Sequence, residues 1–443
     1  MKPPSDYDRV CLLLAVRADG GERTPLFSLT PIERTALAFA RAGVRRFVLA
    51  GDPEAVRAAE SVLRGGPCRS LRIRSVTHVA TAVGDESFFL ARGDCHYDRQ
   101  LVARFVADNA TAVDSVVAVD FRPEAKPRAA DLPLVAVWSR EDERSCVQRV
   151  ARRLVGGDGI LVGLALATPA WARAVDAARD ASDDVEVPAR AESLWLGALA
   201  ALLAREPVST WAVAERWQCV RRIEDVPRAR REVLAGAVRV GDGVIARHLN
   251  RPISLRITER LITWPVKPWQ VSVATFGLTL LAGLSFAIGH ATTGGLLAQS
   301  ASVLDGVDGE LARVRYQDSA FGGLYDALFD RVGEAAVIGG MTLYAWFAGA
   351  GALGVALGFA ALAGNSLSML VKEKYGTQFQ RPWRAEREGR WRWLLLGRDG
   401  RLFLALLAGV TGQIEVVLAY LAVGTHVQAG VRLVQVRSEA VRA

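Results

Sequence analysis

Cysteine is scarce in this 443-residue chain, and the five cysteines all lie in its polar half at irregular spacing. None forms a Cys-x-x-Cys pair, so a reducing cytosol is the expected setting. Residues 1–6 contain no apolar signal core, so we expect no cleaved export segment. The chain also lacks a motif of basic and aromatic residues for nucleic acid, and its net charge of +8 fits an anionic membrane surface better.

Charged residues are plentiful up to about Arg260, and long apolar runs rich in Gly and Ala follow from Trp269. Most of these runs approach the roughly 20 residues that cross a bilayer as a helix. The runs are 271–288, 294–304, 324–346, 350–370 and 402–423, with a weaker one at 425–436. We therefore predict a C-terminal all-α bundle of six transmembrane helices.

The basic residues predict how this bundle is oriented. Lys and Arg crowd residues 372–401, whereas the links at 290–295, 348–351 and 409–413 contain neither. Because Lys and Arg favour the cytoplasmic side, we expect the basic loop and both termini to be cytosolic. The chain is predicted to be a multi-pass protein of the cytoplasmic membrane.

Four aspartates stand at helical spacing inside the most apolar third of the chain. Asp305 and Asp308 share one helix face, and Asp326 and Asp330 share another. If the two helices pack antiparallel, the carboxylates converge around hard cations such as Mg²⁺ or Mn²⁺, which prefer oxygen ligands. Carboxylates at membrane depth are costly, so the segment predicts metal-assisted chemistry near the cytosolic mouth of the bundle.

The segment resembles the signature of the CDP-alcohol phosphotransferase family, D-x2-D-G-x2-A-R-x8-G-x3-D-x3-D, and it matches every fixed position. The resemblance implies that the four aspartates hold a pair of divalent metals. It also makes Asp330 the general base that deprotonates the acceptor hydroxyl. The residues that it implies for CDP binding are Asp305, Gly309, Ala312, Arg313 and Gly322. Family relatives pack as dimers through their membrane helices, so a homodimer is expected.

Basic residues near the entrance of the fifth predicted span indicate where the acceptor binds. In similar enzymes, basic residues at such positions bind the phosphate of a polyol-phosphate acceptor. Membrane positioning of Lys and Arg is the alternative explanation for each one. The candidates are Arg398, Arg401, Lys372 and Lys374.

Residues 1–236 alternate short apolar runs with helical patterns, which predicts a Rossmann-like α/β domain with a mostly parallel sheet. The order of elements resembles the sugar-phosphate nucleotidyltransferases, especially the cytidylyltransferase half of bifunctional inositol-phosphate enzymes. Asp94 retains one metal position of that family, and the neighbouring His96 is expected at the surface. Thr30 replaces the family's triphosphate lysine and Cys219 its second metal-binding acid, so we expect a degenerate domain.

Residues 237–265 mix apolar and basic residues at helical intervals, which predicts an amphipathic juxtamembrane helix. The expected domains are thus 1–236, this linker, and a phosphotransferase domain at 266–443.

The leading hypothesis for function is transfer of a phosphoalcohol group, of phosphatidyl or inositol-phosphate type, from a CDP-alcohol to a polyol phosphate with release of CMP. A bifunctional enzyme whose N-terminal domain also makes the CDP-alcohol from CTP is one alternative. A non-enzymatic membrane protein that binds or transports cations is the other, although no repeated halves typical of transporters are visible.

Overall fold

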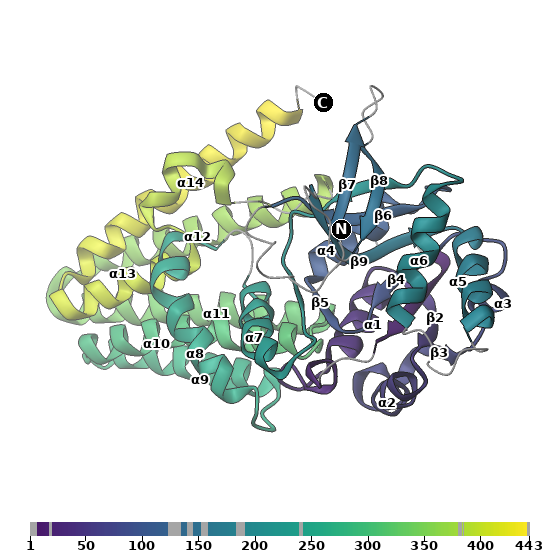
Figure 1. Ribbon diagram of the computed structural model, residues 1–443. Coiled ribbons are helices and arrows are strands. Elements are labelled where there is room, and N and C mark those ends of the chain that lie inside the picture. The colour runs from purple at the N-terminus through teal and green to yellow at the C-terminus, as the bar shows by residue number, and fades with distance from the viewer. Residues whose placement is uncertain are drawn as a thin grey trace. The chain divides into compact units, whose positions relative to one another are not determined.

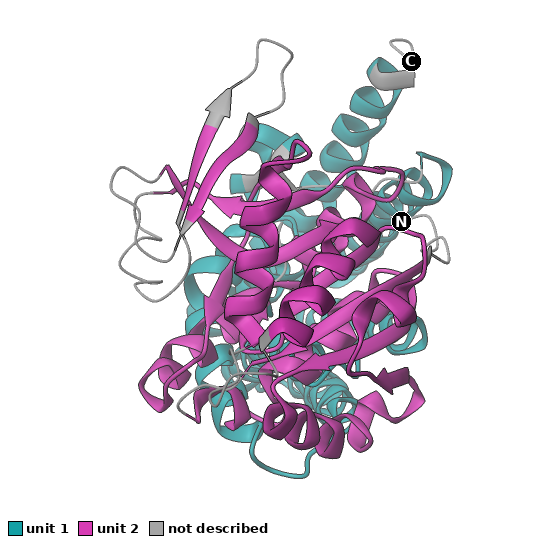
Figure 2. Ribbon diagram, turned by 45° about the vertical axis from the view of Figure 1, so that its right-hand side comes forward, with its two compact units in different colours: residues 1–2, 237–443 teal, residues 3–236 magenta. Residues whose placement is uncertain are grey.

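The computed structural model describes residues 7–16, 20–122, 134–139, 145–151, 158–182, 191–238, 242–379, 383 and 385–440. The chain divides into two compact units, one comprising Pro3–Gly236 and the other essentially Ala237–Ala443 (Figure 2). The first unit contains strands and helices, and the described part of the second is helical.

A sheet of nine described strands forms the centre of the first unit, in the order β3-β2-β1-β4-β9-β6-β10-β8-β7 (Figure 1). The strands are β1 Tyr7–Ala15, β2 Val44–Gly51, β3 Arg72–Ser75, β4 Phe88–Arg92, β6 Val116–Asp120, β7 Leu134–Ser139, β8 Ser145–Ala151, β9 Gly159–Ala167 and β10 Ser209–Ala212. A separate two-stranded sheet pairs β5, Cys95–Tyr97, with β11, Trp217–Cys219.

The large sheet is mixed. Strands β3, β2, β1 and β4 pair in parallel, but β9 lies between β4 and β6 and runs antiparallel to both. The β7–β8 pair is antiparallel as well. The prediction of a mostly parallel sheet therefore holds for the β3-β2-β1-β4 part and for the β6–β10 pair, and it is wrong where β9 enters between β4 and β6 and where β8 pairs with β7 and β10.

The helices of the first unit are α1 Pro31–Arg41, α2 Pro53–Leu63, α3 Val79–Val83, α4 Arg99–Asp108, α5 Pro169–Ser182, α6 Ala191–Leu203 and α7 Val226–Gly236. The central strand β1 carries the fully buried run Cys11, Leu12 and Leu13, as expected for a strand covered on both faces. Thr30 caps α1, because its backbone N–H and its hydroxyl both donate to the Glu33 carboxylate at 2.7 Å.

The described part of the second unit contains a short π-helical segment, Ala246–Asn250, followed by seven α-helices. These are α8 Arg251–Leu261, α9 Pro268–Ala287, α10 Ala291–Val314, α11 Ala320–Ala345, α12 Gly351–Phe379, α13 Arg398–Thr411 and α14 Ile414–Ala440. Tight turns at Gly289 and Gly412, where φ is 93° and 73°, join α9 to α10 and α13 to α14.

Three described helical stretches are long and apolar enough to cross a membrane: Pro268–Ala287, Ala320–Phe379 and Ile414–Ser438. The second of these includes both α11 and α12. Helix α10 contains the first two motif aspartates, and α13 has only 14 residues, so neither reaches the same length and apolarity. The six-span arrangement stays a prediction.

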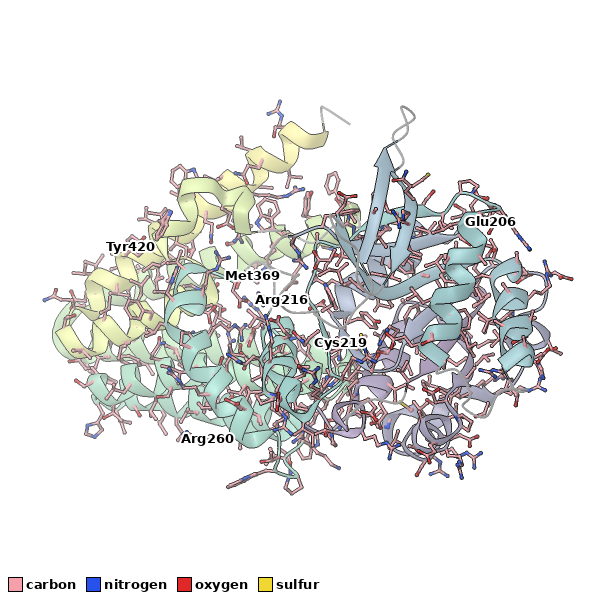
Figure 3. The ribbon with its side chains drawn as sticks, in the orientation of Figure 1. Glu206, Arg216, Cys219, Arg260, Met369 and Tyr420 are labelled. Carbon is pink, nitrogen blue, oxygen red and sulfur yellow. The ribbon has the colours of Figure 1, made fainter. Side chains whose placement is uncertain are left out.

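Glycines allow the helices around the aspartates to approach closely. A Cβ atom added at Gly340 of α11 would lie 2.0 Å from the backbone oxygen of Gly283 in α9. One added at Gly409 of α13 would lie 2.2 Å from the backbone oxygen of Ala291 in α10. Helix α14 packs mainly along α12 and also contacts α13. Its Tyr420, labelled in Figure 3, donates to the Leu394 carbonyl at 2.7 Å.

Candidate active site

The four motif aspartates converge in the second unit. Carboxylate oxygens of Asp305 and Asp308 on α10 and of Asp326 on α11 all lie within 4.8 Å of one another. Asp330 stands one helical turn beyond Asp326 and lines the same small cavity as the other three. The helical spacing therefore predicted correctly which faces the carboxylates share, and α10 and α11 present those faces to each other.

Helix α9 packs against both α10 and α11 and completes this cavity with hydroxyl groups. The Ser272 hydroxyl donates to the Asp308 carboxylate. The Thr275 hydroxyl is buried and has no hydrogen-bond partner among the described residues. Carboxylates with a free hydroxyl beside them form an all-oxygen donor set, which fits Mg²⁺ or Mn²⁺.

Arg398, the first residue of α13, bridges the two acidic helices. Its guanidinium contacts the Asp305 carboxylate on α10, and its Nη2 lies 2.8 Å from Oδ1 of Asp330 on α11. The Arg398 side chain is 15% exposed. The Arg398 guanidinium is thus paired with Asp305 and Asp330, two of the four predicted metal ligands.

Arg401, one turn further along α13, has a different environment. It is 4% exposed, and its Nε donates to Oε1 of Glu334 at 3.0 Å. The other Glu334 oxygen accepts from Arg331 at 3.1 Å and from Asn365 at 3.2 Å. Arg401 is not among the residues that line the acidic cavity or the larger one beside it, and its contacts join α13 to α11.

A larger cavity of about 610 Å³ opens beside the aspartates. Its walls include three of the motif aspartates, Asp305, Asp326 and Asp330, and four further acids, Asp242, Glu373, Glu388 and Asp399. The basic residues in its walls are Arg251, Lys372, Arg398 and Arg432. Lys372 and Arg398 were predicted from the sequence to bind a phosphate. Lys374 is exposed on α12 and is not one of the lining residues.

Arg432 was missed at the sequence level because it lies in the last apolar run. Its Nε donates to Oε1 of Glu388 at 2.9 Å, and its Nη1 donates to the Ser368 carbonyl at 2.7 Å. Gln428, one turn earlier on α14, donates to Glu388 at 3.2 Å. Polar residues four apart on one face of an otherwise apolar helix were the available signal.

The remaining motif residues lie beside the acidic cavity and not in its walls. Gly309, Ala312 and Arg313 are on α10, and Gly322 is in the exposed first turn of α11. Arg313 donates to the Ala237 carbonyl and lies over Gly309, where an added Cβ would come within 3.0 Å of Arg313 Nη1. The absence of a side chain at Gly309 thus gives room to the Arg313 guanidinium.

Helix α8 is attached to α10 through Glu310, a fully buried carboxylate. Glu310 accepts hydrogen bonds from the hydroxyls of Ser254 and Thr258 and from Nη1 of Arg251, each at 2.7 Å. Arg251 also bonds Asp242 at 2.6 Å, and both residues line the larger cavity. The segment predicted as a juxtamembrane helix therefore contributes a wall of this cavity.

In the first unit, Asp94 does not offer free oxygens to a metal. Arg92 donates to both of its carboxylate oxygens, at 3.0 and 2.7 Å. Arg92 and Arg221 also donate to Glu192, at 2.6 and 2.8 Å. Arg221 Nε lies 3.8 Å from Asp94 Oδ2, which closes a ring of two acids and two bases. Burial alone would raise the pKa of Asp94, but the Arg92 and Arg221 guanidinium groups hold it below its ordinary value.

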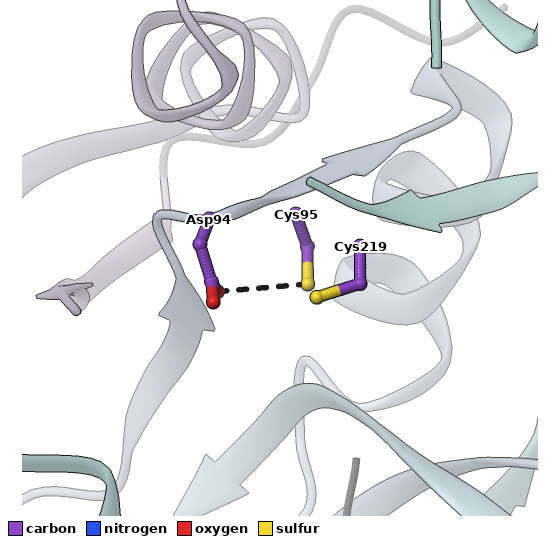
Figure 4. Close-up of side chains that lie close together, drawn as sticks. All are labelled: Asp94, Cys95 and Cys219. Atoms are coloured by element: carbon purple, nitrogen blue, oxygen red, sulfur yellow. Dashed lines mark hydrogen bonds between the residues drawn. The ribbon is translucent and has the colours of Figure 1, made fainter. Parts of the chain in front are cut away.

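Cys219 of β11 lies opposite Cys95 of β5 in the antiparallel strand pair, and both thiols point toward Asp94 (Figure 4). The Cys95 Sγ lies 3.7 Å from Oδ1 of Asp94. The contact with Cys95, together with burial, raises the pKa of the Cys219 thiol well above its ordinary value. Sulfur ligands and a carboxylate occupied by a guanidinium do not fit Mg²⁺, the metal that nucleotidyl transfer would require here.

The prediction that His96 is a surface residue was wrong. His96 is only 5% exposed, because β5 is covered by α1 and paired with β11. Burial, together with nearby Arg34 and Arg99, lowers the pKa of His96 to about 3. It is therefore a neutral core residue.

Residues 268–428 match the model of the CDP-alcohol phosphatidyltransferase family. The match confirms the resemblance inferred from the aspartate signature. It is also consistent with a CDP-alcohol donor and an alcohol acceptor, and with the divalent-metal dependence that is general in the family.

Among curated proteins, one from Rubrobacter xylanophilus named bifunctional IPC transferase and DIPP synthase is 34% identical over 197 residues, which cover 44% of this chain and 43% of that protein. A protein of the same name from Aquifex aeolicus is 32% identical over 222 residues, or 48% of each chain. The chain thus spans less than half the length of these relatives.

Among solved structures, the inositol-1-phosphate CTP transferase from T. maritima covers 51% of this chain and 96% of its own, with a TM-score of 0.39 and 16% identity.

Proposed function

We propose that this protein transfers a phosphoalcohol group from a CDP-alcohol to the hydroxyl of a second alcohol and releases CMP. The observation that carries the proposal is the approach of three carboxylates to within 4.8 Å of one another, with Asp330 and Arg398 alongside. Soft ligands are absent from the described walls of this cavity, which contain carboxylate and hydroxyl oxygens. Such a donor set suits phosphoryl chemistry better than redox or electron transfer.

A pair of Mg²⁺ or Mn²⁺ ions is the proposed cofactor. Asp305, Asp308 and Asp326 would hold the ions, with Asp330 as a shared ligand. When bound, the ions neutralise the diphosphate and the departing CMP. The Ser272 hydroxyl keeps Asp308 oriented toward the cavity.

In the proposed reaction, the acceptor oxygen attacks the β-phosphorus of the CDP-alcohol, and the bond from that phosphorus to CMP breaks. Asp330 takes the proton of the acceptor hydroxyl as the new bond forms. Small side chains on α10 and α11 leave space for the CDP moiety beside the carboxylates. The residues assigned to CDP are Asp305, Gly309, Ala312, Arg313 and Gly322.

A polyol phosphate is the proposed acceptor, since basic side chains line the cavity of about 610 Å³ next to Asp330. We assign Lys372, Arg398 and Arg432 to its phosphate. Arg401 and Lys374 do not line this cavity, so neither is assigned to the phosphate. The names of the relatives, which refer to IPC transfer and DIPP synthesis, support an inositol-phosphate type of substrate.

We further propose that α9 to α14 span the cytoplasmic membrane, with the active site and the first unit on the cytosolic side, and that the protein forms a homodimer. The basic residues between 372 and 401 support this orientation. The proposed domains are 1–236, the linker 237–265 and the phosphotransferase domain 266–443.

For the first unit we propose a structural role. A bifunctional enzyme that also makes the CDP-alcohol from CTP is the second candidate, and the relatives' names favour it. Against it stand the Arg92 contacts with both oxygens of Asp94 and the thiol of Cys219 beside them. These features leave little charge with which to bind a metal-triphosphate complex.

The proposal is tested by CMP release from CDP-alcohols by the purified protein with Mg²⁺ or Mn²⁺, in a screen of donor and acceptor pairs. Asp330→Asn should lower the rate by a factor on the order of 10² to 10⁴, because the substitution removes the base. Glu415→Gln, an exposed acid at the start of α14, is the matched control and should retain the rate. Unchanged CMP release by Asp330→Asn would exclude its role as base.

A further inference from the structure

We infer that Arg398 couples the binding of divalent cations to the binding of a phosphate-bearing ligand. Its guanidinium and the cations compete for the same carboxylate oxygens, and a phosphate in the larger cavity draws the guanidinium away. The inference rests on the proposed function, since it concerns the same aspartates. It assigns Arg398 a positioning role between two binding events.

Competition follows from the contacts of Arg398. Asp305 and Asp330, on different helices, both accept from this one side chain. A carboxylate oxygen that accepts from a guanidinium has fewer lone pairs for a cation, and the positive charge of Arg398 opposes a second positive charge nearby. Full cation binding therefore requires the guanidinium to leave at least one of the two carboxylates.

The Arg398 guanidinium also has access to a second binding environment. It lines both the small acidic cavity and the larger one, whose other basic lining residues are Arg251, Lys372 and Arg432. Its Nε is buried and has no hydrogen-bond partner among the described residues. A planar fork with an unused donor suits a phosphate, which offers several oxygens at once.

The backbone at this point is held in place, so the exchange involves the side chain alone. Arg401, one turn along α13, is fixed to Glu334 of α11. The Gly397 carbonyl accepts from the Arg401 N–H at 2.9 Å, which closes the first turn of α13 around Arg398. The guanidinium can thus move between the two cavities while α13 stays on α11.

Binding linkage gives this arrangement a measurable consequence. If phosphate tightens cation binding by some factor, cations must tighten phosphate binding by the same factor. The alternative is that Arg398 only joins three helices, in which case its removal would weaken the cation site and phosphate would change nothing.

The test is Mn²⁺ binding to the purified full-length protein, followed by electron paramagnetic resonance against free Mn²⁺ without nucleotide. Arg398→Gln should bind Mn²⁺ about tenfold more tightly than the parent protein, within the range usual for coupled sites. Inorganic phosphate should tighten Mn²⁺ binding about fivefold in the parent protein and leave Arg398→Gln unchanged. Equal or weaker Mn²⁺ binding by Arg398→Gln, or a phosphate effect that persists in it, would overturn the inference.

Two further variants separate competition from general charge effects and from misfolding. Lys372→Gln removes the same charge from the same cavity without a described contact to the aspartates, so its Mn²⁺ affinity without phosphate should stay within about twofold. Arg398→Lys keeps the charge but cannot bridge both carboxylates as a fork, so its affinity should lie between the parent and Arg398→Gln.

Asp326→Asn distinguishes the inference from the function on which it rests. If the parent protein shows no saturable Mn²⁺ binding that Asp326→Asn removes, the proposed metal site itself is wrong. If Asp326→Asn abolishes binding while Arg398→Gln matches the parent protein, the site stands and only the coupling is wrong.

Discussion

Two carboxylate–guanidinium pairs join α11 to α13, and they differ in whether they face a cavity. Asp330 and Glu334 are one helical turn apart, and so are their partners Arg398 and Arg401. The Glu334–Arg401 pair is almost completely buried and lines neither cavity, so removing Glu334 would leave the buried Arg401 without its carboxylate partner. The Asp330–Arg398 pair faces two cavities, so its contacts can be exchanged for those of a substrate.

His96 provides a pH-dependent prediction at the residue scale. Its pKa is about 3 in the folded protein, against an ordinary value of 6.5, because burial disfavours the charged form. The unfolded chain therefore binds more protons between these values, and the free energy of unfolding should fall as pH drops below about 6.5, by up to ~1.4 kcal/mol per pH unit. Above that pH the contribution is fully present.

The measurement is the urea midpoint of the full-length protein between pH 7.5 and 4.5, followed by tryptophan fluorescence. His96→Gln should flatten this pH dependence, whereas His78→Gln, an exposed histidine, should leave it as steep as in the parent protein. Equal slopes in the parent and in His96→Gln would contradict the assignment of His96 as a neutral buried residue.

At the scale of elements, α9 determines how closely the two acidic helices approach. Gly340 of α11 meets the backbone of Gly283 in α9, where an added Cβ would lie only 2.0 Å from a backbone oxygen. Gly340→Ala should therefore displace α11, lower the melting temperature by several degrees through a cost of about 1–3 kcal/mol, and weaken Mn²⁺ binding.

The adjacent Gly339 is a matched control, because a Cβ there has no neighbour within 4 Å. Gly339→Ala should keep both the melting temperature and the Mn²⁺ affinity, and the added methyl group favours the helix slightly. Similar losses in the two variants would mean that the α9–α11 contact at Gly340 does not account for the effect.

The acidic cluster could be predicted from the sequence because helical periodicity decides which aspartates share a face. With four aspartates at helical spacing on two helices, few arrangements other than a common cluster are left. The mixed sheet could not be predicted, because the insertion of β9 between β4 and β6 depends on long-range pairing that a local pattern does not encode. The Arg92–Glu192 contact beside Asp94 was missed for the same reason, because its residues lie 100 positions apart along the chain. Arg432 was missed because it lies in an apolar run, and its partner Glu388 is 44 positions away.

At the scale of the whole molecule, the two units differ in whether their acidic clusters are open to a ligand. In the second unit, the oxygens of Asp305, Asp308 and Asp326 face a cavity. In the first unit, Asp94 is neutralised by Arg92 within a closed ring. We therefore expect cation-dependent chemistry from the second unit alone.

This expectation is tested with the full-length protein, CTP, Mg²⁺ and a series of sugar and polyol phosphates. Pyrophosphate release should stay at background, because no described carboxylate in the first unit's predicted metal position is free of a guanidinium. Cys219→Asp should not restore the activity, since Arg92 still occupies both oxygens of Asp94. Pyrophosphate release above background from the parent protein would establish the bifunctional alternative.

The attachment of α8 to Glu310 has a consequence for where the phosphotransferase machinery begins. The family match starts at residue 268, yet Ser254, Thr258 and Arg251, which satisfy this carboxylate, all precede it. A chain shortened to begin at residue 268 would expose the 610 Å³ cavity along one wall and leave Glu310 in the bundle without these donors. The smallest unit that can fold and select an acceptor is therefore longer than the stretch that the family shares.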